Sequence, residues 1–240
     1  MAGSGFGTNF RITTWGETHG AGVGVVVDGC PAGLPLERED VQKYLDRRKP
    51  GQSKYTTQRK EGDQVEILSG IFEGRTTGTP ISMVVYNKDQ RSKDYSNIKD
   101  IYRPGHADFT FDMKYGFRDY RGGGRSSGRE TIGRVAAGAV AAKVLKELGI
   151  EIKAYAKAIA GIEVSKEHFD FAEMNNNPFN MPDKEAAKLV QEKADQMIKE
   201  MDSIGGIIEC QITGMPVGIG ETVLINWMQN FRKPLCPLDQ

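Results

Sequence analysis

The strongest constraint on the fold is a change of sequence pattern near residue 129. From Asn87 to Gly128 hydrophobic periodicity nearly disappears, while Arg, Gly, Asp and aromatic residues accumulate. Arg129 to Leu148 is then rich in Ala, Val and Leu at helical spacing and is followed by Gly149. Long aperiodic stretches inside a compact domain are usually functional or disordered. The pattern therefore predicts a well-packed helix behind a functional loop.

Shorter patterns on both sides predict a mixture of strands and helices. Gly22–Asp28 is a β-branched run bounded by glycine, typical of a strand, and Pro35–Arg48 carries apolar residues at helical spacing. The other predicted elements are strands at 64–69, 80–86, 151–164 and 206–213 and an amphipathic helix at 183–201. This mixture predicts an α+β fold in which helices cover sheets.

Composition narrows the class of protein. Lys plus Arg and Asp plus Glu both number 32, so no global field favours nucleic acid or a membrane surface. Cys30, Cys210 and Cys236 fit no metal-ligand spacing, so we expect free thiols in a reducing compartment and no metal site. No run approaches the ~18 apolar residues of a membrane helix, and the start lacks a leader pattern. These features predict a cytoplasmic protein.

Two of the 3 histidines lie in glycine-bounded segments. His19 belongs to Gly16-Glu-Thr-His-Gly20, and His106 belongs to Arg103-Pro-Gly-His-Ala-Asp108. Histidine titrates near neutrality and is the usual proton donor at physiological pH. Either one alone could be a hydrogen-bonded loop residue, but the pair indicates acid–base chemistry. His168 lies in a polar turn and is expected at the surface.

Two arginine-rich segments predict an anion site. In Arg118–Arg134, glycines precede hydroxyl groups at the start of the predicted helix, where backbone N–H groups and the helix dipole attract anions. Asp46–Lys54 repeats positive charge beside Gly and Pro, and arginine adds bidentate donors for phosphate and carboxylate. A solvated charged face and RNA binding through Arg118–Arg129 are the alternatives, although the packed helix that follows argues against RNA.

These segments resemble the signatures of the chorismate synthase family. In chain order the similar segments are Arg11–Gly20, Asp46–Ser53, Asp89–Tyr95, Arg103–Asp108 and Tyr120–Thr131. The resemblance runs from about Phe6 to about Val223, and the length and order of the motifs argue against chance agreement. It implies an α+β fold, a layered β-α-β-α sandwich of chorismate synthase type.

The resemblance also implies a function. The family converts 5-enolpyruvylshikimate 3-phosphate (EPSP) to chorismate and phosphate by anti 1,4-elimination with reduced FMN, the last common step of aromatic amino-acid biosynthesis. It implies a flavin-dependent lyase that is a homotetramer at full length, with no nucleic-acid or membrane partner. The sequence leaves open whether NADPH reduces the flavin. The alternatives are an inactive anion-binding homologue and, further off, an RNA-binding protein.

Residue roles follow from the matched positions. His19 matches the family residue that protonates the leaving phosphate, His106 the residue that protonates reduced flavin, and Ser127 a residue near the flavin's proton transfers. The flavin-binding positions are Arg125, Ser126 and Ser127, and the substrate- or NADP-binding positions are Arg48, Lys54 and Arg129. Lys54 stands where arginine is common and keeps the charge without the bidentate donor. Arg125, in a glycine loop, is expected to support little of the core.

The last residues depart from the family. Leu224–Gln240 does not resemble it, but back-translation of Ile225–Asn230 in a shifted frame permits Asp-Lys-Leu-Asp-Ala, similar to the family's continuation. We therefore expect an incomplete chorismate synthase domain at 1–223, a frame-shifted tail at 224–240 and a missing C-terminal portion. Such a chain should expose apolar surface and have little or no activity.

Overall fold

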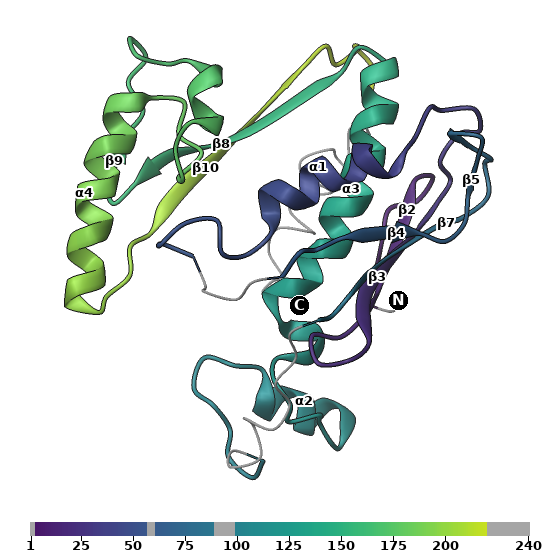
Figure 1. Cartoon of the computed structure of the whole chain (residues 1–240), viewed down its shortest axis with the longest axis horizontal. Helices are drawn as coiled ribbons and strands as arrows, with labels where there is room; N and C mark the ends of the chain where they lie inside the picture. Colours follow the sequence, from purple (N-terminus) through teal and green to yellow (C-terminus); the bar gives the residue numbers. More distant parts are fainter. Residues whose placement is uncertain (1–2, 57–60, 89–98, 220–240) are drawn as a thin grey trace. The chain divides into compact units, whose positions relative to one another are not determined.

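The computed structural model describes residues 3–219 apart from 57–60 and 89–98 (Figure 1). The chain divides into two compact units, which are described separately. The first unit comprises residues 1–50, 59–148 and 216–240, and the second comprises 51–58 and 149–215. Three features of the sequence lie outside the described residues, namely the family segment Asp89–Tyr95, the expected frame-shifted tail 224–240 and Cys236.

The first unit contains a five-stranded antiparallel sheet in the order β1-β2-β3-β7-β4. The strands are β1 (Gly5–Phe6), β2 (Arg11–Gly16), β3 (Gly22–Asp28), β4 (Val65–Ile67) and β7 (Ile81–Tyr86). β5 (Ile71–Phe72) and β6 (Arg75–Thr76) form a separate two-stranded ribbon. The predicted β-branched strand is β3, the central strand, whose Val23, Val25 and Val27 are buried.

Helices α1 (Arg38–Arg48) and α3 (Thr131–Glu147) pack against this sheet and against each other (Figure 1). α3 contacts the three neighbouring strands β2, β3 and β7. Its Gly133 faces β3, where an added Cβ would lie 3.0 Å from the carbonyl oxygen of Gly24. The Ala-rich sequence of α3 therefore permits close helix–sheet packing, and the predicted helix behind the loop is confirmed.

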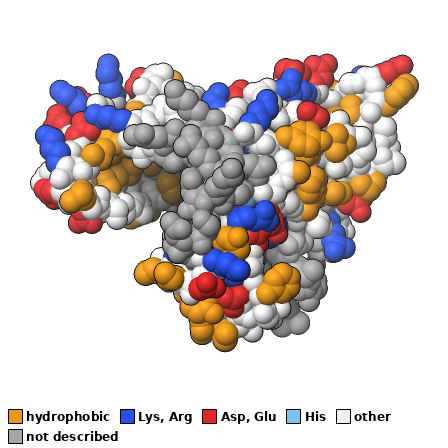
Figure 2. Space-filling view, turned by 60° about the horizontal axis from the view of Figure 1, so that its bottom comes forward, with side chains coloured by type: hydrophobic (Ala, Val, Ile, Leu, Met, Phe, Trp, Pro, Cys, Tyr) orange, Lys and Arg blue, Asp and Glu red, His pale blue; other side chains and the backbone are white. Residues whose placement is uncertain are grey.

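The region before α3 was expected to lack regular structure, and its described part is mostly irregular. It contains one short α-helix, α2 (Asp108–Tyr115), and two 3₁₀ turns, η2 (Gly124–Ser126) and η3 (Gly128–Glu130). α2 ends at Gly116, whose φ of 81° is the left-handed conformation favoured at a helix C-terminus. α2 and its flanks expose hydrophobic side chains among charged ones (Figure 2).

The second unit is a three-stranded sheet covered by a helix. The order is β10-β8-β9, with β8 (Glu151–Ile159), β9 (Ile162–Glu163) and β10 (Gly206–Thr213), and the helices are η4 (Phe171–Asn175) and α4 (Lys184–Glu200). The amphipathic helix predicted at 183–201 is α4. Asp183 caps it by accepting hydrogen bonds from the backbone N–H groups of Glu185 (2.9 Å) and Ala186 (3.0 Å).

One strand prediction is wrong in detail. The segment predicted as a single strand over 151–164 is a hairpin, because Ala160 and Gly161 both have positive φ, 55° and 79°, and reverse the chain between β8 and β9. Two consecutive residues with positive φ are typical of the tightest hairpin turns. The apolar residues on both sides of the turn concealed it in the sequence.

The α+β prediction is confirmed by the sheets and helices of both units. Within the described ranges, no helix is long and apolar enough to cross a membrane. The same residues contain no group of three or more His, Cys, Asp or Glu placed to hold a metal ion. Cys30 and Cys210 are free thiols, as predicted.

Candidate active site

His19 lies in the turn that joins β2 to β3, and only 7% of the residue is exposed. The glycine loop of the arginine-rich segment packs directly on it. Gly122 has φ of 88°, and a Cβ added there would collide with the imidazole ring. Only glycine combines this conformation with so close an approach. This contact brings together the two predicted motifs, Gly16–Gly20 and Tyr120–Thr131.

His106 is exposed in the loop before α2, and its Nδ1 lies 3.0 Å from the carbonyl oxygen of Pro104. Its motif is tied to the same glycine loop. Arg103 donates two hydrogen bonds of 2.8 Å to the carboxylate of Asp108 and one of 3.0 Å to the carbonyl oxygen of Gly122. These bonds from the Arg103 guanidinium hold the pKa of Asp108 far below its usual range. Arg103 thus connects the His106 segment to the loop that covers His19.

Arg125 is half-buried and faces strand β2. Its guanidinium donates to the carbonyl oxygens of Gly16 (3.1 Å) and Thr14 (3.2 Å) and to the Thr14 hydroxyl (2.7 Å). Glu130 accepts a hydrogen bond of 2.6 Å from that hydroxyl and lies 3.6 Å from the guanidinium. These bonds fasten the glycine loop to the sheet, a role that the glycine-rich neighbourhood of Arg125 did not predict.

The two serines shape the start of α3. The Ser126 hydroxyl donates to the carbonyl oxygen of Gly123 (2.7 Å), and the Ser127 hydroxyl accepts from the backbone N–H of Arg129 (3.3 Å). Ser127 is thereby the N-cap of η3, the turn that leads into α3. The two serine hydroxyls therefore lie just before α3, as predicted, at the end of the glycine loop.

Arg48 and Arg129 lie together although they come from different helical segments. A single carboxylate, that of Asp63, accepts 2.6 Å from Arg48 Nη1 and 2.9 Å from Arg129 Nη1. The Asp63 side chain is fully buried, and Arg129 is 7% exposed. Glu61 Oε2 lies 3.8 Å from Arg129 Nη2. Neither acidic residue was predicted from the sequence, where the only signal is two carboxylates around a glycine shortly after an arginine-rich segment.

Lys54 belongs to the second unit, whereas the other predicted site residues belong to the first. Its ammonium lies 2.7 Å from Asp195 Oδ1 of α4, and the Tyr55 hydroxyl donates to the same oxygen at 2.8 Å. Asp195 raises the pKa of Lys54. Within its unit, Lys54 is therefore paired with an acidic side chain.

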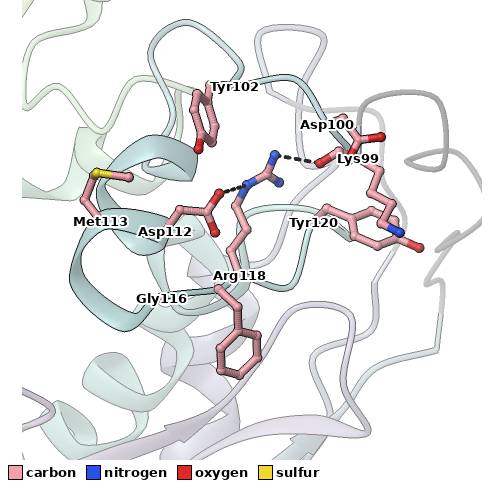
Figure 3. A pocket seen from close by; sticks show the side chains of 9 residues that line it. Lys99, Asp100, Tyr102, Asp112, Met113, Gly116, Arg118 and Tyr120 are labelled. Carbon is pink, nitrogen blue, oxygen red and sulfur yellow. Dashed lines mark hydrogen bonds and ion pairs between the residues drawn. The ribbon is translucent and has the colours of Figure 1, made fainter.

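A pocket of about 420 Å³ opens beside α2, and its lining residues lie on both sides of the His106 motif in the sequence (Figure 3). Arg118 crosses it, donating to Asp112 Oδ2 (3.1 Å) and to the carbonyl oxygens of Lys99 (2.9 Å) and Ile101 (3.0 Å). The guanidinium also lies 5.3 Å from the ring centre of Tyr102. None of the predicted site residues lines this pocket.

Comparisons with known proteins agree with the motifs. The family model described as "Chorismate synthase" matches residues 10–231. The chorismate synthase of Lachnospira eligens is 66% identical over 99% of this chain and 65% of its own length. That of Agathobacter rectalis is 60% identical over 99% of this chain and 65% of its own. The chain therefore spans 65% of the length of these curated relatives.

A solved structure supports the fold independently. A chain titled "Crystal Structure of Chorismate Synthase" superposes with a TM-score of 0.71 at 30% identity, covering 90% of this chain and 62% of its own. The family match covers nearly all of the described residues and contains the histidine, arginine and glycine motifs described above. This chain belongs to the chorismate synthase family.

Proposed function

We propose that this protein is a lyase that converts EPSP to chorismate and phosphate with reduced FMN. The observation that carries the proposal is the packing of Gly122 against the His19 ring. It joins an acid–base histidine to the arginine- and glycine-rich loop that the family uses for flavin. A buried imidazole held beside such a loop suits proton transfer to an anionic leaving group.

The substrate proposal rests on charge. EPSP carries a phosphate and two carboxylates, which planar guanidinium groups bind with two parallel hydrogen bonds. Arg48 is 21% exposed and Arg129 is 7% exposed, and both are held in one place by Asp63. The pair supplies two adjacent guanidinium groups that can recognise the anionic groups of EPSP.

The glycine loop offers room for a flavin. Gly124 and Gly128 have no atom within 4 Å of where a Cβ would stand, so the backbone there is open to a ligand. We assign Arg125, Ser126 and Ser127 to FMN binding, with Arg125 acting through the conformation of the loop that it fastens to β2. When bound, reduced FMN supplies the electron-rich ring that the elimination requires.

The histidines have different settings, which suggests different roles. His19 is buried, so a phosphate dianion beside it would favour the imidazolium form and place a proton close to the leaving oxygen. His106 is exposed and hydrogen-bonds a carbonyl oxygen through Nδ1, which leaves Nε2 to exchange a proton with flavin. Ser127 is fixed as the N-cap of η3, in the glycine loop that we assign to FMN binding. We place it near the proton transfers of the flavin.

Family membership also supports two further proposals, a homotetrameric assembly and a cytoplasmic location. NADPH is a candidate reductant for the flavin, and anaerobic mixing of NADPH with the FMN-loaded protein, followed at the flavin absorbance, tests it.

Ligand selectivity tests the proposed function. We expect calorimetric titration in the presence of oxidised FMN, which prevents turnover, to show EPSP binding at least about tenfold more tightly than inorganic phosphate. That factor corresponds to 1.4 kcal/mol. Shikimate, which lacks the phosphate, serves as the control for the anion. EPSP affinity equal to that of inorganic phosphate would overturn the proposal.

A further inference from the structure

Asp63 is a buried acid that the proposed mechanism does not use. Its side chain has no exposed surface, and each carboxylate oxygen accepts a hydrogen bond from a different arginine. Its backbone has φ of 42°, a conformation that L-residues seldom adopt. Gln42 donates to its carbonyl oxygen at 3.2 Å from α1. The surrounding structure therefore fixes where this carboxylate stands.

The guanidinium group of each arginine is held by hydrogen bonds from both Nε and Nη1. Arg48 Nε donates to the Thr131 hydroxyl (3.3 Å), and Arg129 Nε donates to Asn87 Oδ1 (3.1 Å), while the Nη1 group of each binds Asp63. Two guanidinium ions this close would repel each other without a shared counter-charge. The Asp63 carboxylate is the atom group that holds them side by side.

We propose that Asp63 is a positioning residue for anion binding, which sets the separation and orientation of the Arg48 and Arg129 guanidinium groups for EPSP. The inference deepens the proposed function and rests on it. The Asp63 carboxylate has the same sign of charge as the substrate, and its side chain has no exposed surface. Its contribution to binding is therefore made through the two arginines.

The direction in which anion affinity changes when Asp63 is substituted distinguishes a positioning role from an effect of total charge. Asp63→Asn removes one negative charge beside two arginines, so a site governed by total charge would bind anions more tightly. Positioning predicts the opposite, since the amide accepts at one oxygen only and one guanidinium loses its fixed partner. Asp63→Glu keeps the charge but moves it by one methylene, so only the positioning role predicts a loss.

The test is titration of EPSP and inorganic phosphate into the wild-type chain and both variants with oxidised FMN, so that no turnover occurs. We expect Asp63→Asn to weaken EPSP binding at least tenfold and Asp63→Glu to weaken it severalfold. Asp40→Asn is the matched control, because Asp40 of α1 pairs with Lys143 of α3, away from the arginine pair. It should lower the melting temperature and leave both affinities unchanged.

The arginine Nε–H resonances of the same proteins provide a second readout. In spectra recorded without EPSP, we expect those of Arg48 and Arg129 to shift or exchange faster in Asp63→Asn and to stay in place in Asp40→Asn. Unchanged resonances, or unchanged or tighter phosphate and EPSP binding in Asp63→Asn, would overturn the role of Asp63. A wild-type chain that does not prefer EPSP over phosphate would instead overturn the proposed function.

Discussion

At the scale of single residues, the contact between Gly122 and His19 constrains the site. Gly122→Ala places a methyl group against the imidazole and forces alanine into φ of 88°. We expect a loss of stability above about 1 kcal/mol and a turnover at least tenfold lower, because the ring must move. Thermal melts and single-turnover assays measure both. Gly138→Ala, in α3 with open space around it, should be neutral or stabilising.

The two histidines carry a prediction about turnover. His19→Ala and His106→Ala should each lower the single-turnover rate of EPSP by two orders of magnitude or more, within the ~10²–10⁴-fold range of general acid–base groups. His168→Ala is the control, because His168 is an exposed residue whose nearest acidic partner is Glu185 at 3.4 Å. A rate close to that of the wild type in either of the first two variants would remove that histidine from the mechanism.

Some of these residues could be predicted from the sequence and others could not. His19 and His106 stand inside long motifs, so their type and spacing were enough to select them. Asp63 belongs to no motif, and its importance depends on residues 48, 63 and 129 meeting in space. For Arg125 the glycine-rich neighbourhood was misleading, because the arginine reaches out of the loop to the backbone of β2.

At the scale of elements, Arg125 joins the glycine loop to the sheet. Arg125→Ala leaves the carbonyl oxygens of Thr14 and Gly16 without this donor, so we expect a loss of about 2 kcal/mol in the free energy of unfolding. FMN affinity should fall as well, because the loop is released. Urea unfolding and FMN titration measure the two effects.

Arg134→Ala provides the comparison for Arg125. Arg134 also pairs with Glu130, at 2.9 Å, but its side chain is 45% exposed, so its loss should cost less than about 0.5 kcal/mol. Equal stability losses in the two variants would contradict the role of Arg125 as the fastening of the loop.

Elements with one strong periodicity were predicted well, and those interrupted by a tight turn were not. α3, α4 and β3 occur where their patterns placed them, because a helical or β-branched run fixes type over many residues. The β8–β9 hairpin was missed since its two-residue turn contains alanine, which rarely has positive φ. Gly161 is a local signal for such a turn, but a single glycine in an apolar run does not distinguish a turn from a bulge.

The β8–β10 pair carries a pH prediction. Lys157, Tyr155 and Gln211 hydrogen-bond Glu209 and lower its pKa from 4.5 to about 2. A lowered pKa means stability that is present above pH 4.5 and is lost as the pH falls toward 2. Carboxyl NMR should show Glu209 titrating near pH 2, and Glu209→Gln should flatten the dependence of stability on pH in this range. Titration of Glu209 at its ordinary pKa would show that its hydrogen bonds with Lys157, Tyr155 and Gln211 do not form in solution.

At the scale of the whole molecule, the reading frame of residues 224–240 carries its own prediction. The frame-shift hypothesis predicts that the nucleotides around codon 224 read Asp-Lys-Leu-Asp-Ala in the shifted frame, and that correcting the frame raises turnover. The family match extends to residue 231, which lies inside the expected frame-shifted tail, so the match alone does not decide the hypothesis. Nucleotide sequencing of the gene is the deciding measurement. Nucleotides that cannot be read this way would end the hypothesis.

The assembled site makes RNA binding a weak alternative. Arg103, Arg118, Arg121 and Arg125 of the arginine-rich region all donate to carboxylates or carbonyl oxygens of the protein itself. Arginines held in this way order a loop, and the donors used in these bonds are not available to the phosphates of a nucleic acid. Retention of the protein on RNA at ~0.15 M salt would argue for the alternative.

Product formation tests the proposed function most directly. EPSP is mixed anaerobically with excess protein and reduced FMN, and the quenched mixture is analysed for chorismate and inorganic phosphate. We predict equal amounts of both products, formed only when the flavin is reduced, and their loss in His19→Ala. EPSP recovered intact with reduced FMN both from the 240-residue chain and from the chain with the corrected frame, or phosphate released without chorismate, would contradict the proposal.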